Sequence, residues 1–173
     1  MTTSRLKGQL DAFARTISKE PMGLAHHVPE PWAKPTRCFE NAAAKVRESG
    51  GRVRFGWMFH FRQVLQLGGA GYLIAVHHAV WHAPNGALVD VTPFDPDPLH
   101  RPLTPAGNDD ILFLLDSSAV PIQTANVVAP RPSKFYPVSD DERLIAHIQR
   151  LQAEEDQNCQ RIYGGDGEVS SPT

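Results

Sequence analysis

The sequence predicts an α+β domain in which one central antiparallel sheet packs against a helix that carries a cysteine. Residues 52–62 alternate between apolar and polar side chains as a half-buried strand does, and shorter strand-like segments follow it. Helical spacing occurs only before and after these strands, which is the plan of an α+β fold. We expect residues 1–155 to form this single domain and the polar, glycine-rich residues 156–173 to form a disordered tail.

Composition and charge indicate which classes of partner the protein binds and in which compartment it is found. The formal net charge of the 173 residues is −2, with both signs interspersed, so no basic face predicts binding to nucleic acid or to an anionic membrane. No apolar run is long enough to span a bilayer, and the N-terminus lacks the apolar core of a secretory signal. We therefore expect a cytoplasmic protein.

Three helices are predicted from apolar spacing and from capping residues. The first covers residues 5–18, and the second covers residues 36–51, with Thr36 as its N-cap and two glycines as its stop. The third opens at the S-x-x-E capping box that starts at Ser139. Residues 19–35, between the first two helices, contain four prolines and are expected to form an irregular surface loop.

A hairpin in the middle of the chain decides which polar side chains share a face of the sheet. Its A-P-N-G turn, residues 83–86, suits a type I turn followed by a glycine with positive φ, which gives a three-residue loop and a G1 bulge. In that register Asp90 is a diagonal neighbour of both His78 and His82. A two-residue loop would instead place Asp90 on the face of His77, and the proline favours the first register.

A thiol, two imidazoles and a carboxylate then follow each other in the order of a catalytic triad. Cys38 falls in the first turn of a helix, where the positive helix end and a nearby imidazolium would together favour a thiolate. His78 or His82 would protonate the leaving group, and Asp90 would orient the imidazole. The backbone N–H of Cys38 is a natural donor to the oxyanion, and the indole of Trp32 is a candidate for the second donor.

Three short motifs resemble the papain-like superfamily of cysteine enzymes, in its transglutaminase-like branch. The segment C-F-E-N-A-A-A-K is similar to the cysteine helix of that superfamily, H-A-V-W to its histidine strand and V-D-V-T-P to its aspartate strand. The resemblance covers residues 36–93 and implies a papain-like, transglutaminase-like core with the triad Cys38, His78 and Asp90. The glutamine that papain carries upstream of its cysteine is missing, because Trp32 occupies that spacing.

The histidines do not predict a metal site. On a strand, His78 and His82 would be separated by roughly 13 Å, too far for one ion without a third element. Cys38 and Cys159 lack the spacing of a structural zinc site, and a reducing compartment disfavours a disulfide between them. We therefore assign no metal and no cofactor, and keep Asn41 and His82 as secondary candidates for binding substrate or the oxyanion.

Two functions remain as competing hypotheses. The first is a cysteine-dependent acyl-transfer enzyme, a thiol hydrolase or acyltransferase, that acts on the amide bonds of a protein, a peptide or another amide. It includes peptidases, amidases, deamidases and transglutaminase-like enzymes. The second is a binding module that kept the papain-like scaffold without its chemistry, in which Cys38 is only a small buried hydrophobic residue. The reactivity of the Cys38 thiol distinguishes the two.

Overall fold

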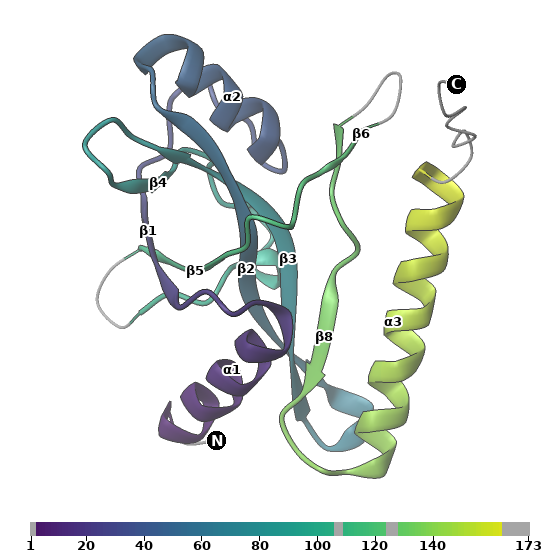
Figure 1. Ribbon diagram of the computed structural model, residues 1–173. Helices are drawn as coiled ribbons and strands as arrows, with labels where there is room; N and C mark the ends of the chain where they lie inside the picture. Colours follow the sequence, from purple (N-terminus) through teal and green to yellow (C-terminus); the bar gives the residue numbers. More distant parts are fainter. Residues whose placement is uncertain (1–2, 106–108, 124–127, 164–173) are drawn as a thin grey trace.

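The computed structural model describes residues 3–105, 109–123 and 128–163, and it is an α+β fold, as the sequence predicts (Figure 1). The α-helices of this part of the chain are α1 (Thr3–Ile17), α2 (Cys38–Ser49) and α3 (Glu142–Tyr163). Its strands are β1 (Met22–His27), β2 (Arg52–Val64), β3 (Ala70–His82), β4 (Leu88–Asp90), β5 (Ile111–Leu115), β6 (Ile122–Gln123), β7 (Val128–Ala129) and β8 (Lys134–Pro137). None of the helices in these ranges combines the length and the apolarity that crossing a membrane requires.

Five strands pair in a closed ring. The order of hydrogen-bonded neighbours is β2, β5, β1, β4, β3 and back to β2, and β8 adds to the outer edge of β3. Within this sheet β1 and β4 run parallel, whereas the other pairs are antiparallel. The expectation of an antiparallel central sheet is therefore wrong, and the sheet is mixed. No turn links β1 to β4, so nothing local forces these two strands into opposite directions.

Strand β1 lies inside the segment that was expected to be an irregular loop. Pro21 and Pro29 bracket it without interrupting it, so their missing N–H groups do not affect its pairing. Of its six residues only Ala25 is buried, and the strand therefore shows no apolar alternation. Its stability comes from backbone pairing with β4 on one side and β5 on the other, which local sequence does not reveal.

The long hairpin β2–β3 supports the whole molecule. The two strands pair along their full lengths, from Arg52 opposite His82 to Val64 opposite Ala70, as the alternation in the sequence predicts. One face of this hairpin packs against α1 and α2. The cluster under α1 includes Leu10, Phe13, Trp57, Phe59, Leu73 and Ala75. The other face carries the polar side chains that line the candidate site.

The hairpin β3–β4 has the register that its turn predicts. Trp81 lies opposite Val89 and His82 opposite Leu88. The N–H of Gly86 donates to the carbonyl of Ala83 over 2.9 Å, and Gly86 has a φ of 91°, so the turn depends on a residue without a Cβ. Asp90 is thereby set on the same face of the sheet as the second histidine of the H-H-A-V-W segment.

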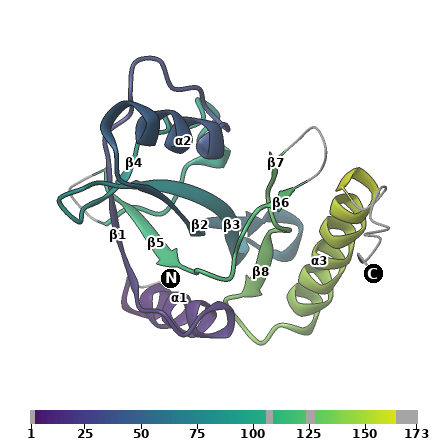
Figure 2. The ribbon, with the colours of Figure 1, turned by 45° about the horizontal axis from the view of Figure 1, so that its top comes forward.

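The last helix differs from its prediction at both ends. Asp141, not Ser139, caps α3, because Oδ1 of Asp141 accepts the N–H of Arg143 over 2.9 Å. The helix continues to Tyr163, so residues 156–163 are helical and not part of a tail, whereas residues 164–173 lie outside the described ranges. It packs beside β8, as Figure 2 shows, through a cluster that includes Val64, Phe135, Leu144 and Ile148.

Candidate active site

Cys38 lies in the first turn of α2, as expected, and the backbone that leads into this helix has an unusual conformation. Arg37 occupies the N-cap position without a side-chain hydrogen bond, and Thr36 is not the cap. Thr36 instead has a φ of 64°, a left-handed conformation that is unfavourable for a β-branched residue. Such conformations concentrate at functional sites, where surrounding structure enforces them. The turn fixes where the thiol of Cys38 points, and the residue is 6% exposed.

His78 and Asp90 form a buried pair. Nε2 of His78 lies 3.1 Å from Oδ2 of Asp90, and the two side chains are 7% and 2% exposed. The ring is not aligned for a hydrogen bond, and among the described residues its Nε2 has no partner of good hydrogen-bond geometry. The contact is therefore an ion pair of an imidazolium with a carboxylate, held out of water.

The side chain of Cys38 also contributes to the raised pKa of this imidazole, and both residues line the same cavity. Because Nε2 faces Asp90, the ring atom left for the thiol is Nδ1. Burial by itself lowers the pKa of His78, but the interactions of its ring with Asp90 and Cys38 outweigh burial and raise this pKa well above 6.5. The three predicted triad residues thus meet, and the imidazole between the other two is charged.

Backbone and side-chain hydrogen bonds hold Asp90 in place. Its Oδ1 accepts the N–H of Thr92 over 2.9 Å, and its carbonyl accepts the N–H of Val28 over 2.9 Å. The ring of His27, at the end of β1, contacts the carbonyl of Thr92 through Nε2 at 3.0 Å. The strand that sequence reasoning missed therefore anchors the backbone of Asp90, while the N–H of Thr92 anchors its carboxylate.

Asn41, a secondary candidate for binding substrate or the oxyanion, has structural contacts. Its Nδ2 donates to the carbonyl of Lys34 over 2.8 Å and to Oγ1 of Thr92 over 3.2 Å, and its Oδ1 accepts the N–H of Lys34. The amide is buried and all its groups are engaged, so it does not bind an oxyanion. It ties α2, the preceding loop and the end of β4 together.

The other two secondary candidates lie away from the triad. Trp32 is 42% exposed and does not line the cavity beside Cys38. His82 lies at the far end of β3, opposite Leu88, and does not line that cavity either. The structure therefore does not bring either residue to this cavity, and the predictions that Trp32 donates to the oxyanion and that His82 contacts substrate stay predictions. Both predictions used spacing along the sequence, which does not show where the closed ring of strands places a side chain relative to Cys38.

A cavity of about 680 Å³ opens beside the triad. Its walls are mainly apolar, and the larger of these side chains are Met58, Ile74, Val76, Phe94 and Phe135. His60 and Arg62 also line it. Sequence reasoning did not assign these two to the site, although the alternation of β2 already placed them on one face with Met58.

His77, the neighbour of His78 on β3, links this strand to two loops. Its Nε2 contacts the carbonyl of Ala119 at 2.7 Å, and its Nδ1 accepts the N–H of Arg131 over 2.8 Å. Burial lowers the pKa of His77 to about 4, so the ring is neutral at pH 7 with its proton on Nε2. His77 is thus a fixed link between β3 and two loops, and not a second acid or base.

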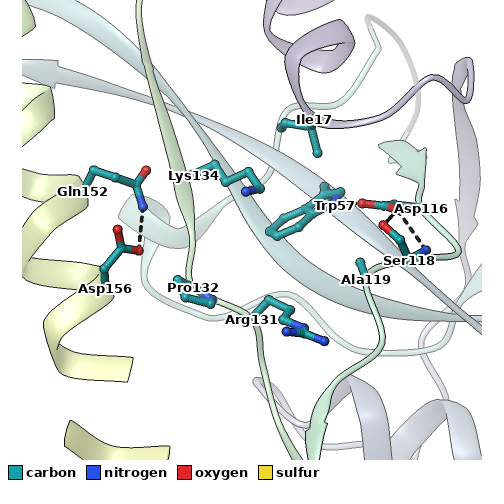
Figure 3. Close-up of a pocket in the computed structure, with 10 residues that line it drawn as sticks. All are labelled: Ile17, Trp57, Asp116, Ser118, Ala119, Arg131, Pro132, Lys134, Gln152 and Asp156. Carbon is teal, nitrogen blue, oxygen red and sulfur yellow. Dashed lines mark hydrogen bonds between the residues drawn. The ribbon is translucent and has the colours of Figure 1, made fainter. Parts of the chain in front are cut away.

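A second, smaller cavity of about 360 Å³ is lined by side chains that form hydrogen bonds to Asp116 (Figure 3). The indole N–H of Trp57 donates to Oδ2 of Asp116 over 2.9 Å, and the hydroxyl of Ser118 donates to its Oδ1 over 2.6 Å. Nζ of Lys134 lies 5.2 Å from the centre of the Trp57 ring. Since both carboxylate oxygens of Asp116 are engaged, we interpret the hydrogen bonds among Trp57, Asp116 and Ser118 as structural.

Comparisons with models of protein families, with curated proteins and with solved structures found no match for this chain. Within the described ranges, no three His, Cys, Asp or Glu side chains are grouped so that they could hold a metal ion. The assignment of a function therefore depends on the geometry of Cys38, His78 and Asp90 and of the cavity beside them.

Proposed function

We propose that this protein is a cysteine-dependent acyl-transfer enzyme that acts on amide bonds, with a papain-like arrangement of Cys38, His78 and Asp90. One observation carries the proposal: the imidazole of His78 is buried and charged between the thiol and the carboxylate, at the end of a 680 Å³ cavity. A charge is costly to bury, and strongly perturbed titration in a cleft is typical of catalytic groups.

Each residue has a defined role in the proposed reaction. The thiolate of Cys38 attacks the carbonyl carbon of the amide, a C–S bond forms, and an electron pair moves to the carbonyl oxygen. The N–H of Cys38 is placed to donate to that oxygen, because N–H groups in a first helical turn have no acceptor within the helix. The C–N bond then breaks, and His78 gives its Nδ1 proton to the departing nitrogen.

The second half of the reaction reverses these roles. The thioester on Cys38 is attacked by water or by an amine, and His78, now neutral, accepts the proton of the attacking group. The C–S bond breaks, an acid or a new amide leaves, and the thiolate–imidazolium pair returns. Asp90 is the positioning residue, since among the described residues its carboxylate contacts the imidazole and the backbone N–H of Thr92.

Site-resolved alkylation tests this proposal. Iodoacetamide at low concentration and pH 7 should modify Cys38 at least tenfold faster than Cys159, although Cys38 is the more buried of the two thiols. Cys159 is an internal reference, and the Cys38→Ala variant should lose the fast phase while keeping its circular dichroism spectrum. Equal modification of both cysteines at an ordinary thiol rate would contradict an activated thiol.

Acylation provides an independent test. With p-nitrophenyl acetate in excess, the protein should release a burst of about one equivalent of nitrophenol and carry an acetyl group on Cys38, seen by peptide mass spectrometry. The Cys159→Ala variant should give the same burst, whereas His78→Gln should give a much slower one.

The low exposure of Cys38 favours the alternative function, a non-catalytic binding module on the same scaffold. In that case the thiol would be inert toward both reagents, and Cys38→Ser would change neither the fold nor the affinity for a partner. The absence of a burst from folded wild-type protein would select this alternative over the enzyme.

A further inference from the structure

The cavity extends along the β2–β3 hairpin, away from the triad. Residues that face each other across the two strands share a face, so the order along this face follows from the register. His78 lies opposite Gly56, Val76 opposite Met58, Ile74 opposite His60, and Tyr72 opposite Arg62. From the Gly56 position to the Arg62 position is six residues of strand, or roughly 20 Å.

The middle of this cavity, here called the trough, is lined by apolar and uncharged side chains. Met58, Ile74 and Val76 form its floor, and Phe135 also lines it. Burial lowers the pKa of His60 to about 4 against the opposing effect of its contact with the carbonyl of Arg101, so at pH 7 this ring is neutral. A ligand that lies in the trough therefore meets hydrophobic surface over most of its length.

Arg62, at the far end, is different from every other charged residue of the lining. Arg37 pairs with Glu40 at 3.1 Å, and Asp95 pairs with His100 at 3.2 Å. Asp90 pairs with His78. Among the described residues no carboxylate lies within ion-pair distance of Arg62, whose contact is a 3.3 Å hydrogen bond from Nη1 to the carbonyl of Phe61.

We propose that the cavity binds an extended, mainly apolar arm of the amide substrate, and that a carboxylate at the end of this arm pairs with Arg62. This inference rests on the proposed function, because Cys38 supplies the reactive end of the same cavity. A guanidinium has more N–H donors than one carbonyl can use, and it suits a carboxylate in particular. The apolar walls contribute affinity, and the distance from Cys38 to Arg62 sets the length of the arm.

Iodoacetyl reagents with a carboxylate tail test the proposal on the intact protein. One series joins the iodoacetyl group to aminohexanoate or aminoundecanoate, and a second joins it to a tetrapeptide of leucine and alanine. Each acid is compared with its own carboxamide, and the saturation constant for alkylation of Cys38 is measured. In at least one series the long acid should saturate at a concentration about tenfold or more below its carboxamide. The short acid should show no such preference.

Variants of two arginines on β2 test whether Arg62 causes the preference for the long acid over its carboxamide. Arg62→Gln should remove the preference for the acid, and Arg62→Lys should restore part of it. Arg52→Gln should leave the preference unchanged, because Arg52 is exposed at the first position of β2. The rate with plain iodoacetamide should be the same in all of these proteins, which shows that the triad is intact.

The outcomes separate this inference from the proposed function. Fast labelling by plain iodoacetamide without any preference for the long acids would overturn the role of Arg62 and leave the enzyme proposal standing. Slow labelling by plain iodoacetamide would overturn the enzyme proposal itself. A preference confined to the peptide series or to the alkyl series would support the inference and would identify the backbone of the arm.

Discussion

Asp90 places one carboxylate oxygen 3.1 Å from Nε2 of His78 while its other oxygen accepts the backbone N–H of Thr92. The carboxylate cannot rotate without losing the second contact, so the negative charge stays at the imidazole. This arrangement makes the charge on His78 a property of the fold, and it can be tested by changing one atom of Asp90.

Asp90→Asn should decrease the alkylation rate of Cys38 at pH 7 by about tenfold or more. Removing the carboxylate removes the charge that stabilises the imidazolium, and one pKa unit corresponds to about 1.4 kcal/mol. The measurement is the iodoacetamide rate by peptide mass spectrometry. Asp95→Asn is the matched control, because Asp95 pairs with an imidazole on the same cavity, at 3.2 Å, but does not contact the triad. An unchanged rate in Asp90→Asn would mean that the carboxylate does not assist the thiol.

Amide and ester substrates should respond differently to high pH. The pKa of His78 is raised, so its acid form is present below that pKa and is lost as the pH rises through it. An acyl p-nitroanilide needs this proton for its leaving nitrogen, whereas a p-nitrophenyl ester of the same acyl group does not. Single-turnover acylation by the anilide should therefore fall at high pH while acylation by the ester persists. Parallel profiles would argue against His78 as the acid.

The buried His60 should make the protein sensitive to acid. Burial lowers its folded-state pKa from 6.5 to about 4, so the unfolded chain binds this proton more readily than the fold does. The contribution of neutral His60 to the free energy of unfolding is complete above pH 6.5. It is lost as the pH falls toward 4, by up to about 3 kcal/mol. His60→Gln should flatten this part of the unfolding free energy profile in urea. His26→Gln, whose parent side chain is 62% exposed, should keep the wild-type slope.

Two strand glycines should differ sharply in their tolerance of a methyl group. A Cβ on Gly56 would overlap the carbonyl oxygen of Leu114 and approach the ring of Phe113, whereas a Cβ on Gly23 would meet nothing within 4 Å. Gly56→Ala should therefore lower the free energy of unfolding by about 1–3 kcal/mol or more, because neighbouring backbone must move. Gly23→Ala should be close to neutral. Urea unfolding of both variants checks this, and equal stabilities would show that β5 does not pack so closely on β2.

Local sequence was sufficient where short-range chemistry decides the structure. The alternation of residues 52–62 predicted β2, and the proline and glycine of the 83–86 turn selected the register that puts Asp90 diagonally across from His78. The helix signals around Cys38 predicted a helix with this residue in its first turn, which the structure has, although Thr36 is not its cap. These three local results are what bring the triad together.

Long-range pairing decided the parts that the sequence did not reveal. β1 has no apolar alternation, and its partners lie more than 60 residues away along the chain, in β4 and β5. Without β1 the ring does not close, so neither the parallel pair nor the cavity could be predicted. The contact of the buried Asn41 amide with Thr92 could not be predicted for the same reason, since Thr92 is far away in sequence.

The closed ring also determines when Asp90 is fixed. The backbone of Asp90 pairs with β1, and β1 pairs in turn with β5, the last strand of the ring to be synthesised. Pairings between such distant segments form late, because closing long loops costs chain entropy. In the proposed enzyme, the contacts that support the imidazole of His78 are therefore complete only after Leu115 has been added and β5 has paired.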